Sequence, residues 1–254
     1  MNHHPYVRSE LRERVQAIID EKNYVPVAVA KDLRRLQTNL IGVVVPSLHH
    51  PFFSQLIQEI SDILKGDCYD VVILQSNFDT NREREFIQYV RTKKLDGLIF
   101  ATLSLPIEEI ECASTSGTIV ICNEHVETEL ISTVQFDEER AGYLGTKHLL
   151  EKGYTRIGFC YDTLKSKAQR MGICVPKDFG VIGFDNQELS MMMNPNITTI
   201  HTSIASMAKT SIALLHKQSQ GERTQRLQLP ISVIERESTR RKEEYVPHKS
   251  FTIS

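Results

Sequence analysis

Short apolar runs and amphipathic stretches alternate along most of the chain from residue 40 onward. Runs such as LIGVVV at 40–45 and TIVIC at 118–122 are apolar at successive positions, which is typical of strands buried on both faces. Strands separated by helices at this interval predict βαβ units and a parallel sheet covered by helices. The expected strands are residues 40–45, 71–74, 97–101, 118–122, 133–136, 157–161, 180–184 and 198–202.

Amphipathic segments with an apolar stripe near the 3.6-residue period of a helix lie between most of these strands. The clearest begins at Pro51, a residue favoured in the first turn of a helix. Its stripe, which we expect in the core, is Phe53, Leu56, Ile57, Ile60, Ile63 and Leu64. The expected helices are residues 51–64, 80–92, 107–110, 137–152 and 204–218.

A second strand–helix series begins near Ser132 and is short of parts. Only 18 residues separate the expected strand that ends at Tyr161 from the one that begins at Gly180, and they contain no further strand pattern. We therefore expect a two-lobed body at residues 39–254. Its first lobe covers about 39–131, and an incomplete second lobe covers about 132–254, with strands crossing between the two.

The first 38 residues follow a different pattern, which predicts a helix at residues 9–22 with Ser9 in position for an N-cap. The apolar stripe of this helix is Leu11, Val15, Ile18 and Ile19. A second helix is expected at residues 29–35. A helix of this length is not stable alone in water, so it needs a partner surface.

The composition is that of an ordinary globular chain of 254 residues, 41% hydrophobic and 24% charged. The net charge of −2 gives no general nucleic-acid or membrane signal, so any basic site must be local. The five cysteines are odd in number and lack metal-type spacing, and four of them lie in or beside apolar runs, which favours buried free thiols in a reducing cytoplasm. The N-terminus has no apolar signal core and no run approaches a membrane span, so we expect a cytoplasmic protein.

Sequence signals of common enzyme classes are missing from the chain. No GxGxxG follows the first strand, no P-loop occurs, and there is no GxSxG elbow. The histidine pairs His3–His4 and His49–His50 could bind a metal, but adjacent side chains point apart on regular elements and no further ligand is placed. We therefore expect neither an enzyme nor a metal or cofactor site.

The order and spacing of several segments carry a family resemblance. These segments are NYVPVAVAKDLRR, LQTNLIGVVVP, LDGLIF, FDEERAGYLGTKHLLEKGYTRIGF, VPKDFGVIGFDN and ITTIHT. Over nearly the whole chain they closely resemble the lactose/purine repressor (LacI/GalR) family of bacterial transcription regulators. The resemblance implies a helix-turn-helix head that reads an operator and a hinge helix that enters the minor groove. It also implies a homodimer whose two-lobed body binds a small effector, a sugar or sugar-like metabolite, between the lobes.

The fold class implied is α/β, with periplasmic-binding-protein-like doubly wound parallel sheets in two lobes and a helical remnant of the DNA-binding head and hinge at residues 1–38. Two departures from the family pattern stand out. The helix-turn-helix pair, which occupies about 20 residues, is expected ahead of Met1 and does not occur in the sequence. The second lobe falls short by about 60 residues, or two strand–helix units of about 30 residues each.

Leu33 is the hinge residue that the resemblance assigns to wedging between base steps. Inserting an apolar side chain there costs about a few kcal/mol of unstacking and kinks the duplex, while neighbouring basic side chains can neutralise phosphates. The alternative is that Leu33 is an ordinary apolar anchor that docks a linker helix on the body. The implied DNA-binding residues are Ala30, Lys31, Leu33, Arg34 and Arg35.

Loops that follow the strands carry the candidate effector contacts, since open α/β sheets bind ligands at the carboxyl ends of their strands. Phe52 and Phe53 follow the first strand, where an aromatic ring can stack on a sugar or base, although either could instead staple the helix to the core. Asp137 matches a family residue at the cleft, but its place also suits an N-cap. Asp185 matches a family aspartate that accepts hydrogen bonds from ligand hydroxyls or amines. Asn123 is a further candidate.

The family's cleft arginine has no clear counterpart, although Lys165, Lys167 and Arg170 lie near its expected place. Two functions therefore stay open. One is a transcription repressor controlled by an effector, which the hinge and the absent signal peptide favour. The other is an effector-binding protein, or a non-functional fragment, without operator binding of its own, which the missing head favours.

Overall fold

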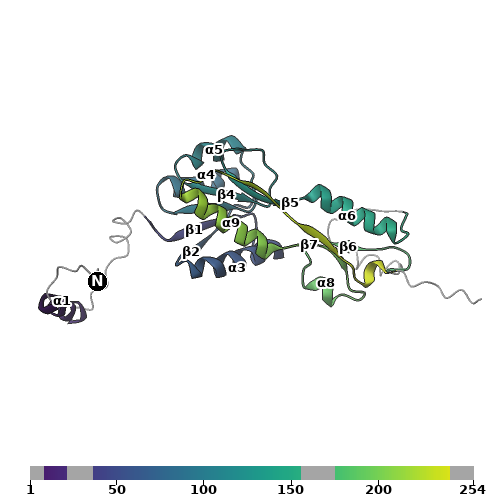
Figure 1. The fold of residues 1–254 in the computed structure, drawn as a ribbon, viewed down its shortest axis with the longest axis horizontal. Helices are drawn as coiled ribbons and strands as arrows, with labels where there is room; N and C mark the ends of the chain where they lie inside the picture. The colour runs from purple at the N-terminus through teal and green to yellow at the C-terminus, as the bar shows by residue number, and fades with distance from the viewer. Residues whose placement is uncertain (1–8, 22–36, 156–174, 241–254) are drawn as a thin grey trace, which may run out of the picture.

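The computed structural model of the chain describes residues 9–21, 37–155 and 175–240. Its strands form two sheets, which we call sheet A and sheet B. Sheet A has six strands in the order β2-β1-β3-β4-β5-β8, and sheet B has three in the order β6-β7-β9. Figure 1 shows sheet A with its helices on the left and sheet B on the right, linked by segments of the chain that cross between them.

Every neighbouring pair of strands in sheet A is parallel, as the apolar runs predict. The central strands β1, β3 and β4 are buried along almost their whole length because both faces of the sheet are covered. The strands of sheet A are β1 Leu40–Val45, β2 Asp70–Gln75, β3 Gly97–Phe100, β4 Thr118–Cys122, β5 Ser132–Phe136 and β8 Arg226–Leu229.

Four helices cover sheet A in two layers. Helices α3 and α9 pack on one face and α4 and α5 on the other, each pair in its own core cluster. Successive residues of β1 alternate between the clusters, with Val43 and Val45 in the first and Val44 in the second. This confirms a doubly wound α/β fold. The helices are α3 Pro51–Gly66, α4 Thr80–Arg91, α5 Ile107–Ser114 and α9 Ile204–Ser219.

Sheet B is mixed, whereas the sequence predicts a parallel second sheet. Strand β6 is parallel to β7, but β9 is antiparallel to β7 because it comes straight from β8 without a helical crossover. The predicted strand at 180–184 shortens to two residues. The elements of this part are β6 Ile182–Gly183, β7 Thr198–Thr202, β9 Ile231–Ile234, α6 Glu138–Glu151, α8 Leu189–Met192 and the 3-10 helix η1 Glu237–Thr239.

The predicted lobe boundary between residues 131 and 132 is wrong. Strand β5 pairs with β4, with Val120 opposite Ser132, so it is the fifth strand of sheet A rather than the first strand of the second lobe. Residues 123–131 make this parallel crossover without a helix. The alternation of strands and helices along the sequence therefore does not show that β5 belongs to sheet A.

Strands β8 and β9 are missing from the predicted set. Their apolar residues Leu227, Leu229, Ile231 and Val233 occur at every second position, which is the signal of half-buried strands. Pro230 interrupts the pattern at the point where the chain leaves sheet A for sheet B. A proline is tolerated there because the backbone is changing from one ladder to the other.

The N-terminal helix predicted at residues 9–22 is present as α1, Ser9–Glu21. The predicted helix at 29–35 and the predicted strand at 157–161 lie outside the described residues. No described helix is long and apolar enough to cross a membrane, and no group of three or more potential metal ligands occurs among the described residues.

Three cysteines fall within the described part of the chain. Cys122 is buried as predicted, whereas Cys68 and Cys112 are exposed, so the prediction of buried thiols is wrong for these two. Cys68 lies in the turn after α3 with a φ of 61°, and Cys112 lies on the outer face of α5. Apolar neighbours in sequence do not bury a side chain that faces outward.

The chain crosses between the two sheets at three places, and these positions define the space between them. It crosses after β5, after β7, and between β8 and β9. Because all strands of sheet A are parallel, their carboxyl ends lie along one edge, from which β5 and β8 leave for sheet B (Figure 1). Loops at this edge therefore face the space toward sheet B.

Candidate functional site

His50 is the polar side chain placed by the loop after β1. It is the N-cap of α3, where its Nδ1 accepts a hydrogen bond of 3.3 Å from the backbone N–H of Phe52, and Pro51 starts the helix. The imidazole is exposed and its ring lies 5.6 Å from the ring of Phe53. Because Nδ1 accepts this bond, the ring nitrogen left for a ligand is Nε2, which the α3 cap presents as a donor at the edge facing sheet B.

The two phenylalanines of this loop differ in burial. Phe52 is only 4% exposed and belongs to the core cluster between α3 and sheet A. Phe53 is half-buried, packs against the same cluster, and meets the ring of Phe52 edge to face at 5.2 Å. Of the two aromatic candidates, only Phe53 has appreciable accessible surface. The buried ring of Phe52 packs against it.

Asn123 follows β4 directly and has a left-handed backbone with a φ of 64°. Its N–H donates to the carbonyl of Val134 at 2.8 Å, which continues the pairing with β5. Asparagine tolerates this conformation better than most residues. The side-chain amide of Asn123 is half-buried and takes no part in this strand pairing. It lies at the same edge of sheet A as His50.

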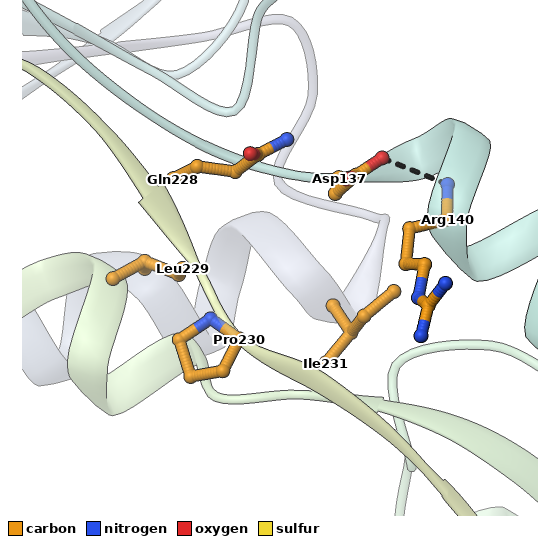
Figure 2. Close-up of a pocket in the computed structure, with 6 residues that line it drawn as sticks. All are labelled: Asp137, Arg140, Gln228, Leu229, Pro230 and Ile231. Atoms are coloured by element: carbon orange, nitrogen blue, oxygen red, sulfur yellow. Dashed lines mark hydrogen bonds between the residues drawn. The ribbon is translucent and has the colours of Figure 1, made fainter.

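Asp137 caps helix α6, since its Oδ1 accepts a hydrogen bond of 2.7 Å from the backbone N–H of Arg140. This bond shows that Asp137 is an N-cap, which is the alternative that the sequence left open and which needs no ligand. Asp137 also borders an open pocket of about 340 Å³ at the crossing between β8 and β9 (Figure 2). The lining residues are Asp137, Arg140, Gln228, Leu229, Pro230 and Ile231.

Asp185 lies on the other side of the space, in the turn after β6. Its φ is 64°, and its Oδ1 accepts a hydrogen bond of 2.7 Å from the hydroxyl of Thr202, at the end of β7. Burial raises the pKa of this carboxyl above its ordinary value, while the Thr202 hydrogen bond and the charge of His50 act in the opposite direction. The charge of His50, the N-cap of α3, therefore acts on the carboxyl of Asp185 in the sheet B turn.

Arg236 fixes the turn that holds Asp185. Its guanidinium donates to Oδ1 of Asn186 at 2.6 Å, to the hydroxyl of Ser190 at 3.0 Å and to the carbonyl of Ile197 at 2.8 Å. The sequence gives no sign of this role, because the partners lie 39 to 50 positions away along the chain. The turn is thus held by Thr202 at the end of β7 and by Arg236, which follows β9.

The structure brings together some of the predicted site residues and not others. Asp137 joins Arg140 at the crossing pocket, and Asp185 joins His50 and Thr202, neither of which the sequence singled out for this role. Within the described part of the chain, no hydrogen bond links Phe53, Asn123 or Asp137 to Asp185. All of the predicted DNA-binding residues, at positions 30–35, and the basic residues at 165–170 lie outside the described residues.

The candidate residues around the space between the sheets are mostly polar. They offer two carboxylates, an amide, an imidazole and an exposed guanidinium, and Phe53 adds a partly accessible aromatic ring. Such a mixture suits a small molecule with several hydroxyl groups, which donates and accepts in many directions.

Two α/β units joined by three crossings, with polar side chains on both sides of the space between them, define a binding protein of the periplasmic type. Residues 38–175 match the family of periplasmic binding proteins and sugar binding domains of the LacI family, and residues 164–239 match a periplasmic binding protein-like domain. The first match spans more than half of the chain. The chain therefore belongs to the LacI family of transcription regulators.

Curated relatives and solved structures agree with this assignment. The NTD biosynthesis operon regulator NtdR of Bacillus subtilis is 29% identical, and the match covers 94% of each chain. The ribose operon repressor of Halalkalibacterium halodurans is 26% identical over 94% of this chain and 91% of the repressor. A periplasmic binding protein/LacI transcriptional regulator from Alkaliphilus metalliredigens, complexed with D-xylulofuranose, has a TM-score of 0.68 and 21% identity over 80% of this chain and 100% of its own.

The alignment with the Bacillus regulator is longer than this chain. It spans 308 positions, 54 more than the 254 residues of this chain, so at least 54 positions of that relative face a gap here. The shortfall of about 60 residues, or two strand–helix units, in the second lobe stays a prediction. Among the described residues, sheet B has half as many strands as sheet A.

Proposed function

We propose that this regulator binds a sugar or sugar-like effector between sheet A and sheet B, with Phe53, Asn123, Asp137 and Asp185 as direct contacts and Phe52 as their support. His50 joins this set because its charge acts on the carboxyl of Asp185. A ligand that touches both sheets favours the arrangement in which they are closest. It can change operator affinity only by as much as it prefers one arrangement over the other.

Asp185 is the observation that carries the proposal. Its backbone is left-handed and its carboxyl is held largely out of water, both of which cost free energy in the unliganded protein. Thr202 and Arg236 hold the turn in this conformation. A carboxylate that lowers the stability of the unliganded protein, and that the fold nevertheless holds in place, is best explained by a role in binding a ligand.

A carbohydrate is the ligand class that fits these groups. Carboxylates and amides accept hydrogen bonds from sugar hydroxyls, and an aromatic ring stacks on the apolar face of a sugar. Two of the similar proteins point the same way, since one is named a ribose operon repressor and another is a structure with D-xylulofuranose. We extend this class of ligand to the present chain.

Operator DNA and a second copy of the chain complete the proposal. Leu33, with Ala30, Lys31, Arg34 and Arg35, is proposed to contact the minor groove, and the body is proposed to dimerise in the cytoplasm. Substituting Leu33→Ala should then weaken duplex binding, because the wedge that stabilises the kink is lost. Leu189→Ala, which removes an exposed leucine of α8, is the matched control.

Thermal unfolding in the presence of sugars tests the effector site. A panel that includes ribose and xylulose is expected to contain a sugar that raises Tm, since a ligand bound only by the folded state stabilises it. Asp185→Ala should abolish that rise. Glu188→Ala, which removes an exposed carboxylate three residues away with no capping bond, should leave it intact.

A flat Tm across the sugar panel would contradict the carbohydrate assignment. An equal Tm rise in wild type and in Asp185→Ala would instead place the ligand elsewhere on the molecule. Binding of sugar without any binding of DNA would favour the alternative of an effector-binding protein.

A further inference from the structure

The end of helix α4 carries a cluster of basic side chains that the effector site does not use. Arg91, Lys93 and Lys94 are all exposed within four consecutive positions. No described residue forms an ion pair with any of the three. Lys93 Nζ donates to the carbonyl of Ser116 at 3.3 Å, and Lys94 Nζ lies 4.3 Å from the ring centroid of Tyr89. These contacts direct the cations without neutralising them.

The basic cluster lies beside the point where the chain enters sheet A. Asp96, two residues after Lys94, accepts hydrogen bonds from the backbone N–H of Thr38 at 2.8 Å and from its hydroxyl at 3.0 Å. It also accepts one from the N–H of Asn39 at 2.8 Å, and its own N–H donates to the carbonyl of Leu40. The carboxylate thus ties the start of β1 to the segment that follows α4.

This corner is at the amino ends of the strands, away from sheet B (Figure 1). Covalent geometry limits how far the proposed DNA contacts can be from it. At no more than about 3.6 Å per residue, Arg35 lies within roughly 11 Å of Thr38, and Leu33 within roughly 18 Å. A duplex that receives Leu33 in its minor groove must therefore pass close to the end of α4.

Charge decides which side of β1 the duplex takes. On the β2 side, Asp70 is exposed and its N–H is bonded to the carbonyl of Asn39, so a negative charge stands next to the chain. On the α4 side, three neutral donors engage the carboxylate of Asp96, and the cations of Arg91, Lys93 and Lys94 outnumber this single negative charge. Phosphates are attracted to the second side and repelled from the first.

We propose that Arg91, Lys93 and Lys94 form a phosphate-binding surface that contacts the DNA backbone next to the segment at residues 30–35. This inference rests on the proposed operator binding. The contacts add affinity that is independent of base sequence, and they hold the body in one orientation on the duplex. Lysine suits the task because a phosphate needs only a point charge within reach.

Salt-dependent DNA binding by the full chain tests the surface. The probe is a labelled duplex of mixed sequence about 30 base pairs long, roughly three helical turns. In the double variant Lys93→Gln, Lys94→Gln, the slope of log K against log salt should be shallower by about 1.8, at about 0.9 per phosphate contact. The matched control Arg82→Gln, Lys209→Gln removes two exposed cations elsewhere on the same lobe, and its slope should equal that of wild type.

Three outcomes separate the possibilities. A shallower slope in the lysine variant alone, with Tm unchanged, supports the surface. Equal slopes in the lysine variant and wild type overturn it while leaving operator binding in place. No binding by wild type at low salt overturns both the surface and the proposed operator binding, whereas the sugar-dependent Tm would still report on the effector site.

Discussion

Asp185 shows how the burial of a single carboxyl couples stability to pH. Its carboxyl is desolvated in the unliganded fold, so the neutral form is favoured and the pKa is raised. A group whose pKa is higher in the folded state stabilises the fold below its unfolded pKa, which is about 3.9 for aspartate. That contribution is lost as the pH rises through the folded pKa, so at neutral pH the charged carboxylate is a liability.

The amide variant Asp185→Asn is therefore expected to unfold at a higher temperature than wild type at pH 7. Asparagine keeps an acceptor for Thr202, tolerates a φ of 64° and carries no charge. The gain should amount to roughly 2–4 °C for each kcal/mol relieved, and it should shrink as the pH is lowered toward 4. Thermal melts of both proteins across this pH range measure it. A variant less stable than wild type at pH 7 would contradict this account of the site.

Cys122 is at the opposite extreme, a titratable group with no role in the site. It is fully buried in β4, and burial raises the pKa of its thiol to about 12. A thiol reagent should modify the exposed Cys68 and Cys112 in the native protein and reach Cys122 only after unfolding, because the thiolate is the reactive form. Mass spectrometry of the labelled peptides follows each cysteine separately. Native labelling of Cys122 as fast as that of Cys68 would show that this core opens readily.

Helix α9 is the element that ties the two halves of the body together. It follows β7 of sheet B, yet it packs with α3 on sheet A. The contact is close at β3, where a Cβ added at Gly97 would lie 3.0 Å from Leu215. A side chain at position 97 would require the end of Leu215 to shift by a few tenths of an ångström.

Truncating Leu215→Ala should destabilise the protein by about 2–5 kcal/mol, the usual cost of a cavity in a well-packed core. Leu215 is 3% exposed and belongs to the cluster between α3, α9 and sheet A. Lys217→Ala, an exposed position on the same helix, is the control and should change stability by about 0.5 kcal/mol or less. Chemical denaturation reports both values. Equal midpoints for the two variants would mean that α9 is not packed as described.

The elements that sequence patterns predict best are those buried on both faces. Strands β1, β4 and β7 begin and end at the predicted residues because their apolar or β-branched runs stop where the burial stops. Strands β8 and β9 are half-exposed and flank Pro230, so their alternation of period two is weak. Patterns along the chain also cannot tell which sheet a strand joins, and β5 was assigned to the wrong lobe for that reason.

The site was harder to predict than the fold because its partners are distant in sequence. Family resemblance led to Asp185, but the hydrogen bond from Thr202 and the support from Arg236 depend on how β7 and the residues after β9 meet. The N-cap role of Asp137 was open to sequence reasoning, since an aspartate directly before a helix is a known capping signal. Which of Phe52 and Phe53 enters the core depended on the rotation of α3 about its axis, which the stripe alone leaves uncertain by one position.

At the scale of the whole molecule, the stretch at residues 226–240 closes both sheets. Strand β8 covers the edge of β5 in sheet A, and β9 covers the edge of β7 in sheet B. Just beyond, the hydroxyl of Ser238 accepts from the N–H of Thr198 at 2.8 Å and donates to the carbonyl of Val181 at 2.6 Å, which joins β6 and β7. One short segment therefore holds β5 and β7, which begin 66 positions apart in the chain, at Ser132 and Thr198.

A chain that ends at Gln225 should consequently lose order in both halves rather than in one. Removing β8 and β9 exposes the apolar face of sheet B and leaves β5 and β7 with unpaired edges, which favours unfolding and association. We expect Tm to fall by roughly 10 °C or more, since 2–4 °C accompanies each kcal/mol lost at this size. The control ends at Arg240 and keeps every described element. If the shorter chain melts like the control, the crossing at Pro230 does not couple the sheets, and an effector bound between them would have to signal through the crossings after β5 and β7 alone.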